Sequence, residues 1–199
     1  MTPEAANKVV AGLKQAGIDF VAYLPETRLS EILPVLKADK SFMLVPVASE
    51  AEAVGIAAGA SLGGKQPALY MEGTGLFVSS YNLLTLGERY GVPMLLLISY
   101  IGSMDDRRST FLYSHYGTHT VPQLEALGIQ YEIVNQAANI ETRIENAVRR
   151  DRASIGCSKV IVLPTDNHGE SRERAPTFAL CVTLHRGVPG FVPNERHRP

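Results

Sequence analysis

Short apolar strands alternate with helical segments along most of this chain, and this alternation constrains the fold more than any other feature of the sequence. The predicted strands are brief runs of apolar and β-branched residues, namely Asp19–Leu24, Phe42–Val47, Pro67–Met71, Met94–Ser99, Tyr131–Val134 and Lys159–Leu163. Strands separated by helices build a parallel sheet that helices cover on both faces. We therefore expect an α/β fold of three layers, doubly wound around a mainly parallel six-stranded sheet.

The predicted helices begin and end at residues that are typical of helix caps. Thr2-Pro3-Glu4 combines an N-cap, a first-turn proline and a first-turn acid, and the helix that follows should end near Gly17. Glu50–Leu62 is a helix of small residues, whose glycines would let it pack very close to a neighbour. Tyr100–Thr118 is polar and shows no clear period, so we expect a long loop there, followed by a short helix at Pro122–Leu127.

The length of 199 residues suits one α/β domain with a short extension. We predict that the domain covers residues 1–165. Residues 166–199 become polar and then rich in proline, glycine and arginine, so we expect an extension that is partly disordered or used in assembly. Within it, Thr177–Leu184 has the composition of one further strand.

Charge and cysteine content exclude several classes of function. A net charge of −1 leaves no electrostatic footprint for nucleic acid or for an anionic membrane. Cys157 and Cys181 form neither a CxxC motif nor a metal-ligand spacing, and no signal-peptide pattern follows the first residues, so a cytoplasmic location is expected. The longest apolar runs, such as Met94–Ile98, are far too short to span a bilayer.

Ligands of open parallel sheets bind at the carboxyl ends of the strands. Four loops should therefore border the site: Pro25–Arg28, Ala48–Glu50, Glu72–Phe77 and Tyr100–Thr118. In the second of them a carboxylate stands where a strand passes into the first turn of the small-residue helix. The segment resembles the pyrimidine-binding domain of thiamin diphosphate-dependent enzymes, which has an acid here, a small residue three positions later and a glycine nine positions later.

Glu50, Ala53 and Gly59 match those family positions, and further motifs follow in the same order. They are the turn Gly73-Thr74-Gly75-Leu76, the strand entry Tyr90-Gly91-Val92-Pro93 and the segment Leu124–Ile129. The resemblance covers roughly residues 5–165. Within the family the chain is most similar to the α subunits of sulfopyruvate decarboxylase and to the N-terminal half of phosphonopyruvate decarboxylase.

The resemblance implies that Glu50 activates thiamin diphosphate. A carboxylate hydrogen-bonded to ring N1′ favours the imino tautomer, whose 4′-nitrogen removes the C2 proton of the thiazolium. Partial burial would help, because it raises the pKa of a carboxyl group and lets the group share a proton. The alternative is a first-turn carboxylate that stabilises the helix dipole by about 0.3–1 kcal/mol. We expect Glu52 to face the surface or an interface.

The turn at Thr74, Gly75 and Leu76 is the second candidate cofactor contact, through backbone amides at a helix start. The alternative is a plain N-cap at Thr74. Two departures from the related decarboxylases stand nearby. Phe77 replaces a glycine, and Ile101 replaces an arginine that would suit a sulfonate or phosphonate.

Candidate substrate-binding residues are Pro25, Glu26, Arg107, His115 and His119. Arg107 would take over the role of the missing arginine, and either histidine would be an acid or base near the substrate. The alternatives are a solvated arginine among neighbouring acids and hydrogen-bonded loop histidines.

The Gly-Asp-Gly and Asn-Asn motifs, which hold the diphosphate and Mg²⁺ on a second domain in this family, do not occur in the chain. The resemblance therefore implies a partner β subunit that binds Mg²⁺ and shares the cofactor, with no metal ligand in this chain and with self-association of α chains in a hetero-oligomer. The leading hypothesis is the α subunit of a 2-oxoacid decarboxylase. The alternatives are a subunit of a thiamin diphosphate-dependent C–C lyase or carboligase, and a catalytically silent subunit.

Overall fold

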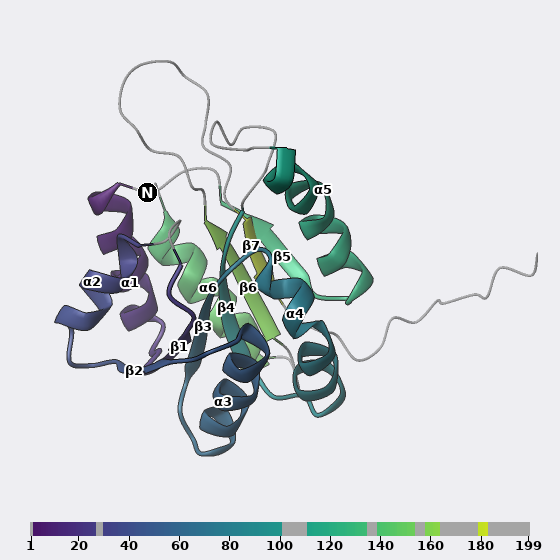
Figure 1. Ribbon diagram of the computed structural model, residues 1–199. Helices are drawn as coiled ribbons and strands as arrows, with labels where there is room; N and C mark the ends of the chain where they lie inside the picture. Colours follow the sequence, from purple (N-terminus) through teal and green to yellow (C-terminus); the bar gives the residue numbers. More distant parts are fainter. Residues whose placement is uncertain are drawn as a thin grey trace, which may run out of the picture.

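The computed structural model describes residues 2–26, 30–100, 111–134, 139–153, 158–163 and 179–182 (Figure 1). The strands are β1 (Phe20–Tyr23), β2 (Met43–Pro46), β3 (Pro67–Glu72), β4 (Met94–Ser99), β5 (Gln130–Ile133), β6 (Ser158–Leu163) and β7 (Ala179–Val182). The helices are α1 (Pro3–Gln15), α2 (Ile32–Ala38), α3 (Glu50–Leu62), α4 (Gly75–Asn82), the π-helix η1 (Leu83–Arg89), α5 (Phe111–Ala126) and α6 (Ile140–Ala153).

The strands form one sheet in the order β2-β1-β3-β4-β6-β5-β7. The first six are mutually parallel, which confirms the predicted parallel core. The seventh, Ala179–Val182, runs antiparallel beside β5 and β6 and lies within the segment where one further strand was expected. Every residue of β4 is buried, as are the first five of β3, because helices cover both faces of these central strands.

Alternate residues of the central strands point into two separate cores. Val21, Tyr70 and Leu97 pack against α1, α2 and α6 on one face. Leu69 and Leu96 pack against α3, α4, η1 and α5 on the other. Figure 1 shows this arrangement, with α1 and α2 on one side of the sheet and α3, α4 and α5 on the other. The predicted three-layer, doubly wound architecture is therefore confirmed.

Local capping chemistry fixes the ends of the helices. The hydroxyl of Thr2 accepts a hydrogen bond from the Ala5 amide at 3.2 Å, and Pro3 occupies the first turn, as the sequence predicted. Positive φ angles of 67° to 87° occur at the glycines that follow α1, α3, η1 and α5, a conformation that costs glycine little; these are Gly17, Gly64, Gly91 and Gly128.

The prediction of a loop over Tyr100–Thr118 is wrong for its last part, because α5 already begins at Phe111 and continues through Pro122. The buried face of this helix includes Gly117 and Thr120, with Leu124 as a larger apolar residue. Small and polar residues on a buried face leave no apolar period in the sequence, so tertiary packing rather than pattern defines the helix. Within the described residues, no helix is long and apolar enough to cross a membrane.

Candidate functional site

The winding of the sheet changes direction between β1 and β3. After β1 the chain passes through α2 on one face, and after β3 it passes through α4 on the other. Such a switch point opens a crevice at the carboxyl ends of the two strands. The start of α4 directly follows β3 there, and the start of α3, which carries Glu50, packs against α4.

Glu50 and Gly75, the first residues of α3 and α4, are in direct contact. A β-carbon at position 75 would lie 2.4 Å from Cγ of Glu50 and 2.8 Å from both Cδ and Oε1 of its carboxylate. A side chain at position 75 would force the Glu50 side chain to move, because real β-carbons essentially never approach another heavy atom so closely. Glycine at this position therefore lets the Glu50 carboxylate lie directly on the first turn of α4.

Two other side chains cap the start of α3, so Glu50 is not needed for that task. The hydroxyl of Ser49 accepts a hydrogen bond from the Ala51 amide at 3.2 Å. The exposed Glu52 carboxylate accepts one from the Ala48 amide at 2.8 Å, close to the pattern of a capping box. The half-buried Glu50 carboxylate has no hydrogen-bond or ion-pair partner in the described part of the chain.

Thr74 does not cap α4, although an N-cap was the alternative expectation for it. Its hydroxyl donates to the carboxylate of Glu72 at 2.8 Å, and its side chain makes no capping hydrogen bond. Leu76 is fully buried in the core, and its amide donates to the Gly73 carbonyl at 3.3 Å. Of the three candidates in this turn, Gly75 has the most direct relation to Glu50.

Asn82, at the end of α4, holds α3 and α4 together, a role that sequence reasoning missed. Its side-chain amide donates to the carbonyl of Ala51 at 2.7 Å, in the first turn of α3. α5 is joined to α4 as well, since the Gln123 side-chain amide donates to the Ser80 hydroxyl at 2.9 Å. A polar side chain inside an apolar helix was the available signal for Asn82.

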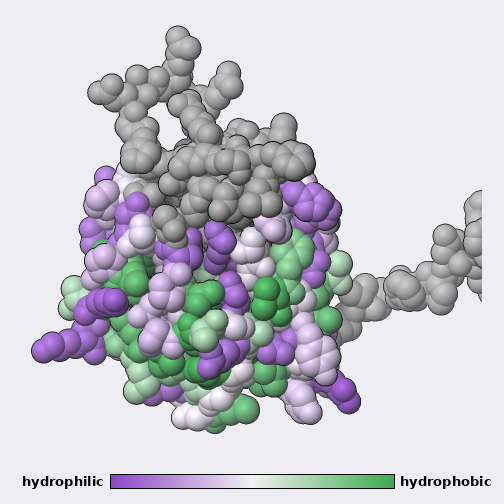
Figure 2. All heavy atoms as spheres, viewed as in Figure 1, coloured by the Kyte–Doolittle hydropathy of each residue, from purple (hydrophilic) through white to green (hydrophobic). Residues whose placement is uncertain are grey.

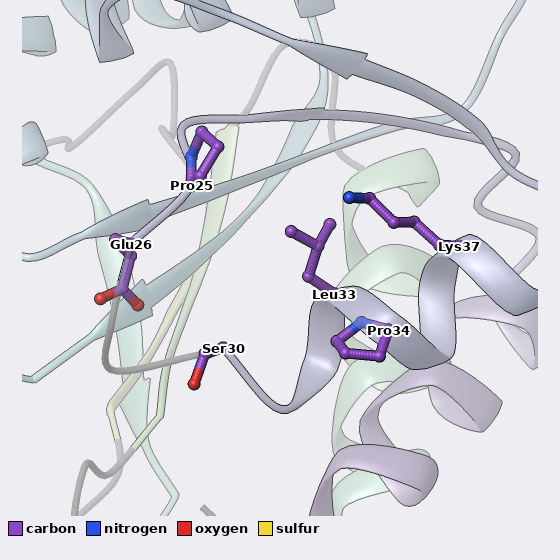
Figure 3. A pocket seen from close by; sticks show the side chains of 6 residues that line it. All are labelled: Pro25, Glu26, Ser30, Leu33, Pro34 and Lys37. Carbon is purple, nitrogen blue, oxygen red and sulfur yellow. The ribbon is translucent and has the colours of Figure 1, made fainter.

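Pro25 and Glu26 border an open hollow of about 490 Å³ beside the end of β1 (Figure 3). Leu33 and Lys37 extend from α2 toward the segment that carries Pro25, and Ser30 and Pro34 complete the lining. The hollow thus combines a carboxylate and an amine with apolar side chains.

The phenol of Tyr70, in β3, is fully buried and lacks a hydrogen-bond partner among the described residues. Burial raises the pKa of this phenol far above its usual value, and the negative charges of Glu26 and Glu31 raise the pKa further. Tyr70 therefore keeps its proton at any physiological pH.

His115 and His119 lie one turn apart on α5 and are both exposed, with their ring centres 4.5 Å apart. Nδ1 of His119 lies 2.7 Å from the carbonyl oxygen of His115, so this nitrogen is the donor. The ring of Tyr116 lies 6.4 Å from that of Phe77 and brings α5 against α4. No hydrogen bond or ring contact between described residues joins either histidine to Glu50.

Arg107 and Ile101 lie outside the described residues. In the described part of the chain, no group of three or more His, Cys, Asp or Glu side chains could hold a metal ion.

Comparison with known proteins identifies the family. Residues 3–128 match the family described as "Thiamine pyrophosphate enzyme, N-terminal TPP binding domain". The chain therefore belongs to the thiamine pyrophosphate enzymes, and it contains their N-terminal cofactor-binding domain. It is similar to two proteins named sulfopyruvate decarboxylase subunit alpha, with 38% identity over 103 residues for that of Methanothermobacter thermautotrophicus and 33% over 127 residues for that of Methanococcus maripaludis.

These matches cover 52% and 64% of this chain, and 62% and 75% of the two relatives. A longer relative, the sulfopyruvate decarboxylase of Methanosarcina acetivorans, is 29% identical over 142 residues, which are 71% of this chain but 35% of that protein. The fold also resembles part of a 2-oxoglutarate:ferredoxin oxidoreductase from Magnetococcus marinus. The TM-score is 0.55 at 16% identity, and the match covers 95% of this chain and 31% of that one.

Proposed function

We propose that this chain is the pyrimidine-binding α subunit of a heteromeric thiamin diphosphate-dependent 2-oxoacid decarboxylase, active with a partner β subunit. One observation carries the proposal. The Glu50 carboxylate is half-buried, rests on the backbone of Gly75 and has no partner in the described chain, while Ser49 and Glu52 do the capping. The names of the relatives support a decarboxylase made of subunits.

The residues present at the start of α3 fit the aminopyrimidine of the cofactor. A carboxylate with free acceptor oxygens, placed where a β-carbon of residue 75 would otherwise lie, can receive a ring nitrogen that carries a proton. When bound, thiamin diphosphate would supply a nucleophilic carbon and a positively charged thiazolium ring, which takes up the electron pair left behind when CO₂ departs. Glu50 holds the proton at ring N1′, and the contact with Gly75 restricts where its carboxylate can lie.

The partner chain completes the site. This chain lacks the Gly-Asp-Gly and Asn-Asn motifs, so the β subunit carries the diphosphate and the Mg²⁺ that neutralises it. The α chains also associate with one another within the hetero-oligomer, in the cytoplasm. On this basis the isolated α chain binds the cofactor weakly or not at all.

The substrate is a small 2-oxoacid, and Pro25, Glu26, Arg107, His115 and His119 remain the candidates for contacting it. The relatives' names favour a substrate with a sulfonate tail. Phe77 favours a substrate with an uncharged tail, because it places an apolar ring, which lies against Tyr116, where the related decarboxylases carry glycine. A second candidate reaction, C–C cleavage or carboligation of a hydroxyacyl substrate, uses the same Glu50. A panel of 2-oxoacids with anionic and apolar tails separates these possibilities.

The test is reconstitution with the chain from the same genome that carries the Gly-Asp-Gly and Asn-Asn motifs, with thiamin diphosphate and Mg²⁺. Release of CO₂ from a 2-oxoacid is expected. Glu50→Gln should lower the turnover number by about 10²-fold or more, as the loss of an acid–base group does. The matched control is Glu52→Gln, whose amide oxygen can still accept from Ala48. Full activity of Glu50→Gln would refute the mechanism and favour a catalytically silent chain.

A further inference from the structure

His115 and His119 lie on the exposed side of α5, one helical turn apart. Residues four positions apart on a helix project side by side, and the ring centres of these two are 4.5 Å apart, with the ring planes inclined by 45°. In Figure 2, which views the molecule as Figure 1 does, purple spheres lie over the upper part of α5, so hydrophilic side chains are at the surface there. The pair is therefore open to ions from solution.

Hydrogen bonds fix the orientation of the His119 ring. Its Nδ1 donates to the carbonyl oxygen of His115 at 2.7 Å, and the hydroxyl oxygen of Thr118 lies 3.1 Å from the same nitrogen. With the proton on Nδ1, the lone pair is on Nε2, at the far side of the ring. Metal-binding histidines almost always donate their other ring nitrogen in this way, often to a backbone carbonyl. His119 thus has the tautomer and the support of a metal ligand.

His115 is available as a second ligand. Neither of its ring nitrogens has a hydrogen-bond partner within the described residues, and its ring contacts are with Tyr116 and His119. A ligand nitrogen must be free to offer its lone pair, so this ring can turn toward an ion without losing a hydrogen bond to the described chain.

The separation of the two rings fits a shared ion. An imidazole that binds through Nε2 places its ring centre about 3.2 Å from the ion, because metal–nitrogen bonds are about 2.0–2.1 Å long. Two such rings at right angles around the ion have centres about 4.5 Å apart, and at the tetrahedral angle about 5.2 Å apart. The observed 4.5 Å matches the right angles of square-planar and octahedral sites.

We propose that His115 and His119 form a binding site for a late first-row divalent transition-metal ion, with Ni²⁺ and Cu²⁺ as the ions whose geometry fits best. Imidazole suits such ions, whereas Mg²⁺ and Ca²⁺ prefer oxygen ligands and octahedral or larger shells. Two protein ligands leave the other coordination positions to water, so the ion exchanges readily. This inference goes beyond the proposed function, which assigns no metal to this chain, and does not depend on it.

The ion clamps a weak part of α5. Gly117, between the two histidines, disfavours a helix, and Pro122 cannot donate a backbone hydrogen bond to the Thr118 carbonyl. The two histidines reach one ion only when the turn between them is helical, so binding stabilises that turn. Because α5 contacts α4 through an aromatic pair, the clamp also stabilises a helix that packs beside the start of α4.

Titration calorimetry of the untagged full-length chain with Ni²⁺, without thiamin diphosphate or Mg²⁺, tests the site independently of catalysis. The double variant His115→Asn/His119→Asn should weaken Ni²⁺ binding by about 10²-fold, because the second ligand of a chelate acts at a high effective concentration. Each single variant should lose nearly as much, since one imidazole makes no chelate. Mg²⁺ in place of Ni²⁺ should give no binding that depends on either histidine.

The chain offers a matched control. Its three other histidines, His168, His185 and His197, lie outside the described residues. Changing all three to asparagine removes more imidazole groups than the double variant does, yet the affinity for Ni²⁺ should be unchanged.

Two further measurements check how the ion is held. At a Ni²⁺ concentration 100-fold above Kd, hydrogen exchange of the backbone amides between the two histidines should slow by about 10²-fold, because the turn must release the ion before it unfolds. The double variant should show no such protection. With Cu²⁺, electron paramagnetic resonance should report two nitrogen ligands in the chain and fewer in each single variant.

Equal Ni²⁺ affinity of the unchanged chain and the double variant would overturn the proposal, as would loss of the affinity in the control variant. Binding that requires both histidines but leaves hydrogen exchange in α5 unaltered would support the metal site and refute the clamp. CO₂ release by the reconstituted complex tests the proposed function separately in every case.

Discussion

Two helical layers cover the same sheet, and each contains a very close approach at a glycine. In the layer of α1, α2 and α6, a β-carbon at Gly12 would lie 2.9 Å from Cα of Glu141. In the layer of α3, α4 and α5, a β-carbon at Gly75 would meet the Glu50 side chain at 2.4 Å. The first glycine lets two backbones pack, whereas the second positions a carboxylate.

The outer sides of the two layers also differ in the charge of the residues that they expose. α1 carries an ion pair between Lys8 and Glu4 at 2.8 Å, and Lys14 reaches Asp39 beside α2 at 2.7 Å. The corresponding side of α3 and α4 presents glycine, leucine, valine and tyrosine. The first layer thus exposes paired charges, whereas the second exposes small and apolar residues and contains the contact between Glu50 and Gly75.

The largest effect is expected for Gly75→Ala, which tests whether this glycine positions the carboxylate. Its methyl group displaces the Glu50 carboxylate, so the turnover number of the reconstituted complex should fall by about 10²-fold or more. Because both changes act through one carboxylate, Gly75→Ala combined with Glu50→Gln should lose little more than Glu50→Gln alone. Additive losses in the steady-state rates would show that Gly75 acts elsewhere.

Gly12→Ala is the matched change in the other layer. Its methyl group meets the backbone of α6, which must shift, so the free energy of unfolding should fall by about 1–3 kcal/mol in urea titrations. The turnover number per assembled complex should not change, because no catalytic group lies in this contact. A large loss of turnover without loss of stability would erase the distinction between the two glycines.

The smallest expected effect is on how the stability of the layer of α1, α2 and α6 depends on pH. Hydrogen bonds from Lys14 and from Ser41 lower the pKa of Asp39 from 3.8 to about 2. The resulting stabilisation is nearly complete above pH 4 and is lost as the pH falls through 2, because below that pH the carboxylate carries a proton in both states. Asp39→Asn should therefore lower the thermal midpoint slightly at pH 6 and much less at pH 2, as calorimetry can show. A constant difference across this range would contradict the assignment.

The alternating pattern of the sequence predicted the six parallel strands and their cover of helices, because buried central strands are apolar throughout. It did not predict the first part of α5, whose buried side includes Gly117 and Thr120 in place of an apolar stripe. For the site, position in the chain pointed to Glu50. The contact with Gly75 and the hydrogen bond from Asn82 join residues 25 and 31 positions apart, so only the folded chain brings them together.

The lack of space between Glu50 and Gly75 also has a consequence for the evolution of related chains. In a chain that keeps the glutamate, a side chain at position 75 displaces the carboxylate, whereas a chain that has lost the glutamate has no such restriction. The two positions should therefore vary together among relatives. Retention of both would mark subunits still under selection for chemistry, and drift at both would mark subunits that have kept the fold for assembly alone.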